Sequence, residues 1–115
     1  MRWTMLALLA ALAGPASAQT GDANPRLVLK DHRFTPDQIE VPAGRRFRLE
    51  VVNADATADE FESAGLKVER NIAPHGKLVL QLGPLAPGDY PFVGDLHADT
   101  AKGVLHAREA SAPAN

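Results

Sequence analysis

The chain has 115 residues, with 14 acidic and 12 basic side chains, no cysteine and a formal net charge of −2 at pH 7. A charge this small and this mixed argues against a nucleic-acid-binding surface, and the absence of cysteine excludes disulfides, thiolate metal ligands and a thiol nucleophile. The length allows one domain with a modest core, which must be held together by packing and hydrogen bonding alone.

The first segment, residues 1–18, has the organisation of a secretory signal. Arg2 supplies a positive start, residues 5–14 (MLALLAALAG) form a short apolar stretch, and residues 16–18 (ASA) form a small-residue cleavage site. The apolar stretch is about ten residues, whereas a membrane-spanning helix needs ~20; a retained N-terminal anchor is the alternative. We expect cleavage after Ala18, export to a periplasm, and a mature chain with no Cys, Met or Trp and no membrane span.

The mature chain is predicted to form one domain. Residues 19–25 (QTGDANP) are polar and predict a flexible leader, residues 111–115 (SAPAN) predict a flexible tail, and residues 26–110 lie between them. There are no internal repeats and no low-complexity tract in this part of the sequence.

Alternation of apolar and polar residues predicts short strands along residues 26–110. The alternation is found at residues 27–29, 38–41, 46–52, 77–82 and 103–107, and proline or glycine at 36, 42–44, 74–76 and 87–88 separates these stretches. Short strands with such turns between them predict an all-β sandwich or barrel. Residues 54–66 (ADATADEFESAGL) are the exception, and they predict one helical turn or an irregular connection.

Histidine and carboxylate side chains are the candidates for chemistry. No serine lies in a Gly-x-Ser-x-Gly motif and no glycine-rich phosphate loop is present, which argues against hydrolase and nucleotide-binding functions. Asp95 and His97 lie two residues apart, and on an extended backbone such side chains project from the same face. They could therefore point at one ion while Leu96 packs inward.

A second pair of polar side chains has the same spacing. Glu60 and Glu62 flank Phe61, so that two carboxylates would point outward and the aromatic ring inward. Glu69 and His32 are further candidates. Each of these groups could equally be a solvated surface side chain, as we expect for His75 and His106, so the spacing alone does not establish a metal site.

Several motifs, in this order, resemble the cupredoxin-like domains of bacterial iron-uptake systems. The motifs are the residues 34–36 (FTP), 41–44 (VPAG), 59–63 (DEFES), 83–90 (GPLAPGDY), 94–97 (GDLH) and 100–103 (TAKG). Such domains are similar to the N-terminal part of EfeO-type proteins and to single-domain partners of a high-affinity iron permease. The resemblance implies a Greek-key, cupredoxin-like β-sandwich in the periplasm.

The resemblance also implies a metal site and a function. The family is thought to bind copper and iron and to handle ferrous iron before transport. Matched by motif, the metal ligands would be Glu60, Glu62, Asp95 and His97, with Glu69 and His32 as additional candidates. The expected cofactor is a copper and/or iron ion in a non-blue site, because a blue-copper centre requires a cysteine thiolate.

The expected partners are an iron permease and other periplasmic components of an iron-uptake system. Enzyme activity stays open, because copper-dependent oxidation of ferrous iron and simple metal binding could use the same ligands. Two other functions stay open as well, a periplasmic copper(II)-binding or delivery protein and an interaction module without a metal. A homodimer is compatible with the sequence, which does not decide the oligomeric state.

Overall fold

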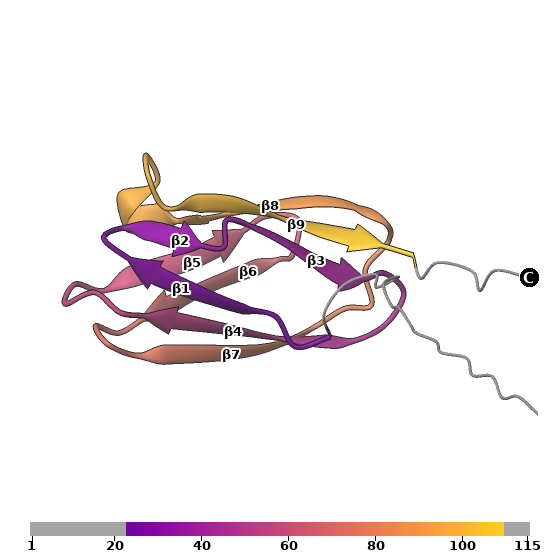
Figure 1. Cartoon of the computed structure of the whole chain (residues 1–115), viewed down its shortest axis with the longest axis horizontal. Coiled ribbons are helices and arrows are strands. Elements are labelled where there is room, and N and C mark those ends of the chain that lie inside the picture. The colour runs from indigo at the N-terminus through magenta and orange to yellow at the C-terminus, as the bar shows by residue number, and fades with distance from the viewer. Residues whose placement is uncertain (1–22, 110–115) are drawn as a thin grey trace, which may run out of the picture.

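The computed structural model describes residues 23–109, which form nine strands and one short helix. The strands make two sheets, a four-stranded sheet in the order β2-β1-β4-β7 and a five-stranded sheet in the order β3-β9-β8-β5-β6. Figure 1 shows the strands running along the long axis of the molecule. The predicted signal segment, cleavage site and C-terminal tail lie outside the described residues.

The strands have the following bounds: β1 (Arg26–Lys30), β2 (Arg33–Thr35), β3 (Gln38–Pro42), β4 (Phe47–Asn53), β5 (Asp59–Ser63), β6 (Val68–Ile72), β7 (Lys77–Leu82), β8 (Gly88–Gly94) and β9 (Lys102–Arg108). The predicted all-β sandwich is confirmed. The prediction of a helical turn or irregular connection for residues 54–66 is wrong, because β5 lies within this stretch and pairs with both β6 and β8.

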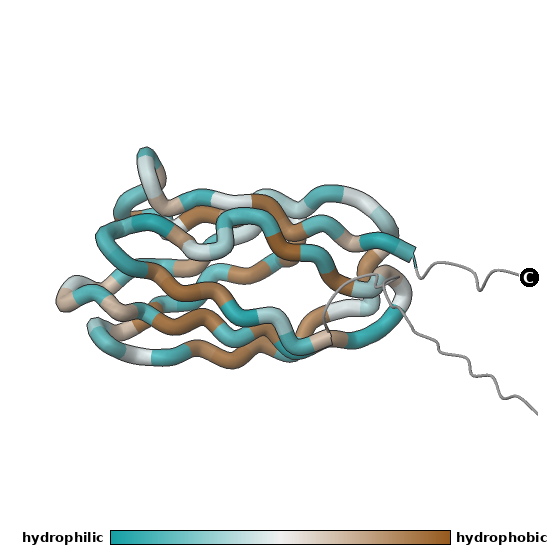
Figure 2. Tube along the Cα trace, viewed as in Figure 1, coloured by the Kyte–Doolittle hydropathy of each residue, from teal (hydrophilic) through white to brown (hydrophobic). Residues whose placement is uncertain are grey.

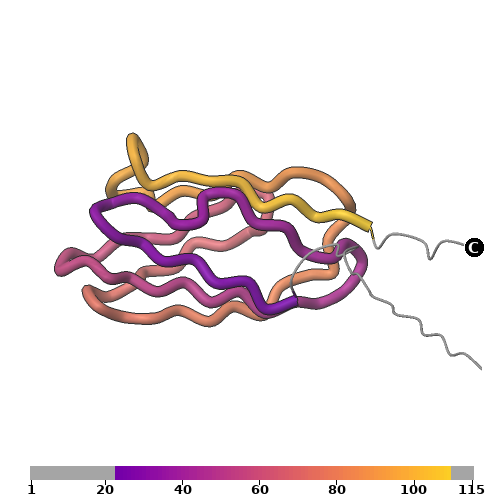
Figure 3. The backbone as a smooth tube through the Cα atoms, viewed as in Figure 1, coloured from indigo at the N-terminus to yellow at the C-terminus, as the bar shows by residue number. Residues whose placement is uncertain are grey.

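The chain passes between the two sheets early in the sequence. β1 and β2 form an antiparallel hairpin in the four-stranded sheet, and the next strand, β3, joins the other sheet and pairs in parallel with the last strand, β9. β4 then returns to pair in parallel with β1. The trace in Figure 3 follows this path, which places segments from the two ends of the described chain side by side.

The core lies between the two sheets and follows from the alternation in the sequence. In β4, Phe47, Leu49 and Val51 are buried while the intervening side chains are partly exposed. The rings of Phe61 and Phe92 lie 5.5 Å apart between their centroids, and both are in contact range of the Phe34 ring. Hydrophobic positions alternate with hydrophilic ones along the strands in Figure 2.

Within residues 23–109 there is no helix with the length and apolar character of a membrane span.

Candidate metal site

The candidate site is built on β5, which lies between β6 and β8 in the five-stranded sheet. Phe61 is fully buried, and this directs the neighbouring Glu60 and Glu62 to the outer face of the sheet, as predicted. Glu62 lies opposite Glu69 of β6, and Glu60 lies opposite Asn71. The pairing of β5 with β6 therefore places three carboxylates on one face.

Asp95 adds a fourth carboxylate to this group. It begins the 3-10 helix η1 (Asp95–His97), which directly follows β8, and its negative charge is close enough to Glu60 and Glu62 to raise the pKa of both carboxyls. We refer to Glu60, Glu62, Glu69 and Asp95 as the acidic cluster.

Two members of the acidic cluster, Glu60 and Glu62, have raised pKa values. Desolvation, followed by the negative charges of Glu69 and Asp95, raises the pKa of Glu60. The charge of Asp95, followed by desolvation, raises the pKa of Glu62. Among residues 23–109, none of the four carboxylates forms an ion pair with a basic side chain. The cluster therefore concentrates negative charge that the described part of the chain leaves uncompensated.

His97 belongs to a different group of side chains. Its Nδ1 lies 2.9 Å from Oδ2 of Asp59, whose side chain is only 1% exposed. Oδ1 of Asp59 accepts hydrogen bonds from the backbone amides of Glu60 (2.7 Å) and Leu96 (3.0 Å). Because an ionised carboxylate can only accept, Nδ1 of His97 donates to Asp59, and in the neutral form of the ring the lone pair is then on Nε2.

The predicted extended backbone at residues 95–97 is wrong. These residues form a 3-10 turn, so Asp95 and His97 do not project from one face, and Leu96 is 59% exposed instead of packing inward. The amide of Leu96 is tied to Asp59, which holds the turn against β5. As a result, Asp95 faces the acidic cluster while His97 faces Asp59.

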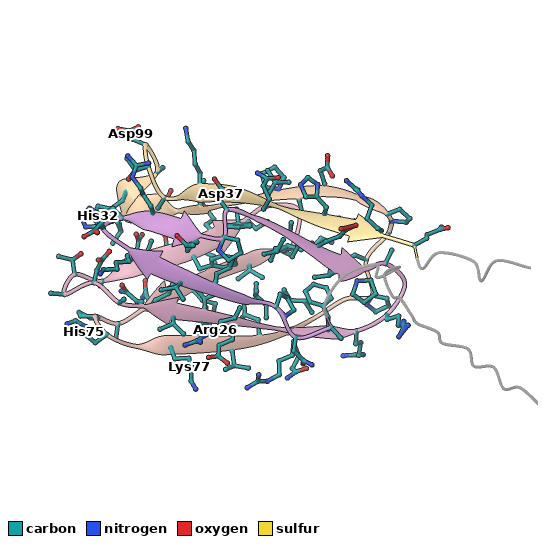
Figure 4. All side chains as sticks on the ribbon, in the orientation of Figure 1. Arg26, His32, Asp37, His75, Lys77 and Asp99 are labelled. Carbon is teal, nitrogen blue, oxygen red and sulfur yellow. The ribbon has the colours of Figure 1, made fainter. Side chains whose placement is uncertain are left out.

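His32 stacks on His97 at the same end of the sandwich. The two ring centroids lie 3.7 Å apart and the ring planes differ by 6°. His32 has a positive φ of 59° in the turn after β1, and the carboxylate of Asp55 accepts its backbone amide at 2.9 Å. The hydroxyl of Thr100 donates to its carbonyl oxygen, which joins this turn to the loop after η1. Figure 4 shows His32 and Asp99 at this end of the molecule.

The structure thus divides the six predicted site residues into two neighbouring groups. Glu60, Glu62, Glu69 and Asp95 meet in the acidic cluster, and His97 meets His32 beside Asp59. In residues 23–109, no three or more His, Asp or Glu side chains are arranged closely enough to hold one metal ion. The carboxylates lie near one another without forming a finished coordination shell.

Asp59 is the residue of this region that the sequence interpretation did not assign to the site. The sequence did contain one indication that Asp59 is buried. It lies two positions before Phe61 in the same strand, so its side chain points inward with the ring. Gly94 makes room for its carboxylate, since a Cβ atom at position 94 would lie 2.6 Å from Oδ2 of Asp59.

The remaining two histidines lie apart from both groups. His75 is exposed in the turn before β7, as expected. His106 is in β9, where its Nδ1 lies 2.7 Å from Oδ1 of Asp89.

Comparison with known proteins agrees with this fold. The model of the cupredoxin-like domain family matches residues 2–107, and the chain belongs to that family. An uncharacterized protein of Rickettsia prowazekii (strain Madrid E) is 40% identical over 92 residues, which is 80% of this chain and 74% of the relative.

Solved structures show the same sandwich at low sequence identity. Auracyanin of Roseiflexus castenholzii is 14% identical, with a TM-score of 0.63 over 76% of this chain and 98% of that chain. A purple cupredoxin of Nitrosopumilus maritimus is 12% identical, with a TM-score of 0.56 over 72% of this chain and 98% of that chain. The predicted cupredoxin-like β-sandwich is therefore confirmed.

The donor atoms available here do not fit a blue-copper centre. Such a centre needs a cysteine thiolate, and this chain has no cysteine. The carboxylate oxygens and imidazole nitrogens that are present are donor types of other transition-metal sites.

Proposed function

We propose that this protein binds iron and/or copper in the periplasm, and that it assists the oxidation and uptake of ferrous iron together with a membrane iron permease. The acidic cluster is the observation that carries this proposal. Four carboxylates from β5, β6 and η1 lie near one another. Desolvation and then the charges of Glu69 and Asp95 raise the pKa of Glu60, and the charge of Asp95 and then desolvation raise the pKa of Glu62. A bound cation would relieve this repulsion.

The chemistry of the donors favours hard cations. Carboxylate oxygens bind iron, and their negative charge holds the trivalent ion more tightly than the divalent ion. A site that stabilises ferric iron lowers the reduction potential of the iron couple. This favours transfer of one electron from ferrous iron to an acceptor such as copper(II), which becomes copper(I). The same oxygens, with an imidazole, would also bind copper(II), which has the highest affinity among the divalent ions of the series.

His97 would supply the nitrogen donor. Asp59 holds the Nδ1 proton and fixes the ring, so the lone pair on Nε2 is available, which is the usual arrangement of a carboxylate supporting a histidine ligand. Iron binding with this nitrogen donor therefore requires His97 and the carboxylates to move together around the ion, because no three such side chains among residues 23–109 are arranged to hold one. The chain itself supplies ligands, charge and orientation.

The alternative function is the binding or delivery of copper(II). The stacked imidazoles of His32 and His97 favour it, because imidazole is a good ligand for copper(II). Deletion strains separate the two functions, since loss of growth under iron limitation supports iron handling and copper sensitivity supports copper delivery.

Metal titration of two double variants tests the binding site. Copper(II) sulfate in air and ferrous sulfate without oxygen are titrated calorimetrically into the wild type and into Glu60→Gln/Glu62→Gln. We expect the double variant to bind at least ten times more weakly, because it loses two anionic donors.

The matched control is Glu40→Gln/Glu109→Gln, which removes the same charge. Glu40 is in β3 near Arg108, and Glu109 directly follows β9, so neither belongs to the acidic cluster. Equal weakening in both double variants, or unchanged binding in the first, would contradict the proposed site.

A further inference from the structure

The two outer faces of the sandwich carry opposite charge. On the four-stranded sheet, the side chains that point outward include five basic residues and one acidic residue, Glu50; the basic residues are Arg26, Lys30, Arg33, Arg48 and Lys77. We call these five residues and the strands that carry them the basic sheet face.

The five-stranded sheet has the reverse composition. Its outward-pointing side chains include five acidic residues, Glu40, Glu60, Glu62, Glu69 and Asp89, and only two that are always basic, Lys102 and Arg108. The net charge of −2 for the chain therefore conceals a molecule with one positive and one negative side.

The basic sheet face is not neutralised by its own acidic residue. Glu50 lies 3.5 Å from Arg26, 3.7 Å from Arg48 and 3.9 Å from Lys77, so one carboxylate is shared among three cations. Figure 4 shows Arg26 and Lys77 near each other on this side of the molecule.

Two further cations on this face have no acidic partner among the described residues. Lys30 and Arg33 lie directly opposite each other in the β1–β2 hairpin, and both are exposed. Like charges at directly opposite positions in an antiparallel pair destabilise it. The fold therefore tolerates a repulsion that an external anion would relieve.

The cations are distributed over four adjacent strands instead of converging on one point. Neighbouring strands lie about 4.8 Å apart, so the face is an extended positive surface. Half-buried Val28 and Val52, with Val79 at 37% exposure, lie between the charged side chains. Such a surface matches a layer of many anions better than it matches a single small anion.

We propose that the basic sheet face binds the surface of a lipid bilayer that contains anionic phospholipids. The two sheets of a sandwich pack about 10 Å apart, and the Debye length at 0.1 M salt is about 10 Å. The side chains on the outer faces add to this separation of about 10 Å, so the acidic face lies farther from the bilayer than the Debye length, where the bilayer would not strongly repel it. The protein would rest on the membrane with its acidic side toward the aqueous phase.

Vesicle co-sedimentation tests this proposal without reference to any metal. The protein purified from the periplasm is mixed with vesicles of phosphatidylcholine, alone or mixed with phosphatidylglycerol, at low and high sodium chloride. We expect binding only to the anionic vesicles and only at low salt. Equal binding to vesicles of phosphatidylcholine alone would overturn the proposal. The absence of binding to anionic vesicles at low salt would also overturn it, even if the protein bound soluble polyglutamate.

Charge variants locate the binding face. A basic residue near an anionic bilayer contributes about 1 kcal/mol, or roughly fivefold in affinity, so Lys30→Glu/Arg33→Glu should lower the partition coefficient by at least about 25-fold. Lys67→Glu/Lys102→Glu is the matched control with the same change in net charge, and it should lower binding much less. Equal losses in the two double variants would show a net-charge effect and overturn the proposal.

Two further experiments test whether the effect needs charge reversal and whether the face binds a single small anion. Lys30→Gln/Arg33→Gln removes the charges without reversing them and should also weaken binding strongly, and circular dichroism verifies that the variants are folded. Inorganic phosphate at matched ionic strength should displace the protein no better than chloride. Selective displacement by phosphate would identify a single-anion site and contradict the proposed bilayer contact.

Discussion

Asn in place of Asp59 should change which ring nitrogen of His97 is protonated and should also destabilise the fold. The buried carboxylate accepts the two backbone amides of Glu60 and Leu96 through Oδ1 and the Nδ1 proton of His97 through Oδ2. An asparagine has the same shape, and its oxygen can still accept the two amides. Its NH2 group would then face Nδ1 of His97, where it can only donate.

The donor in Asp59→Asn should therefore reverse the tautomer of His97. With Nδ1 accepting, the neutral imidazole must carry its proton on Nε2, and the lone pair proposed for metal binding is lost. The substitution also turns hydrogen bonds to a charged group, worth about 1.5–3 kcal/mol each, into neutral ones worth about 0.5–1.5 kcal/mol each. For a domain of this size, roughly 4–8 °C of melting temperature corresponds to 1 kcal/mol, so we expect a decrease on the order of 10 °C.

Two measurements check this prediction. Nitrogen-15 NMR of the imidazole ring reports which nitrogen is protonated, and thermal unfolding followed by circular dichroism reports the stability. Asp99→Asn is the control, because it makes the same charge change at an exposed position just after η1. If Asp59→Asn kept the Nδ1–H tautomer and the wild-type melting temperature, the assigned role of Asp59 would be refuted.

Three other variants probe the same region. Glu62→Gln should raise the melting temperature of metal-free protein at pH 7, because the charge of Asp95 raises the pKa of Glu62 and folding therefore disfavours its ionised form. The gain should shrink as the pH falls through that raised pKa and the wild-type carboxyl becomes protonated, and a gain that grew at low pH would contradict the assignment. Gly94→Ala should destabilise the protein by about 1–3 kcal/mol in urea unfolding, because the new Cβ would meet the Asp59 carboxylate; an unchanged midpoint would show that the close approach is relaxed at no cost. Phe61→Ala should cost about 3–5 kcal/mol in the same assay, because it leaves a cavity between the sheets; a loss below 1 kcal/mol would mean that the ring is not central to the core.

The sandwich could be predicted because alternation and turn residues carry most of its information. β4 and β7 alternate cleanly in the sequence, and their side chains face the core as the pattern requires. β5 was harder to recognise, because its stretch is acidic and follows three alanines in residues 54–58. Its strand conformation comes from pairing with β6 and β8, which no local pattern reports.

The candidate site shows the same division between local and tertiary information. The outward direction of Glu60 and Glu62 followed from the apolar residue between them. The turn at Asp95–His97 did not, because it depends on amide contacts with the buried Asp59, which is 37 positions away from Leu96. The net charge of the whole chain likewise could not reveal the basic sheet face. Counting the charged residues at alternate positions of each strand separately would have indicated it.

Paramagnetic NMR with copper(II) gives the most direct test that a metal ion binds at the acidic cluster. Substoichiometric copper(II) broadens amide signals within a limited distance of the bound ion. We expect broadening to begin at residues 60–62, residue 69 and residues 95–97, and Glu60→Gln/Glu62→Gln to abolish it there. Broadening that begins instead at His106 or His75, with β5 and η1 unaffected, would contradict the central claim.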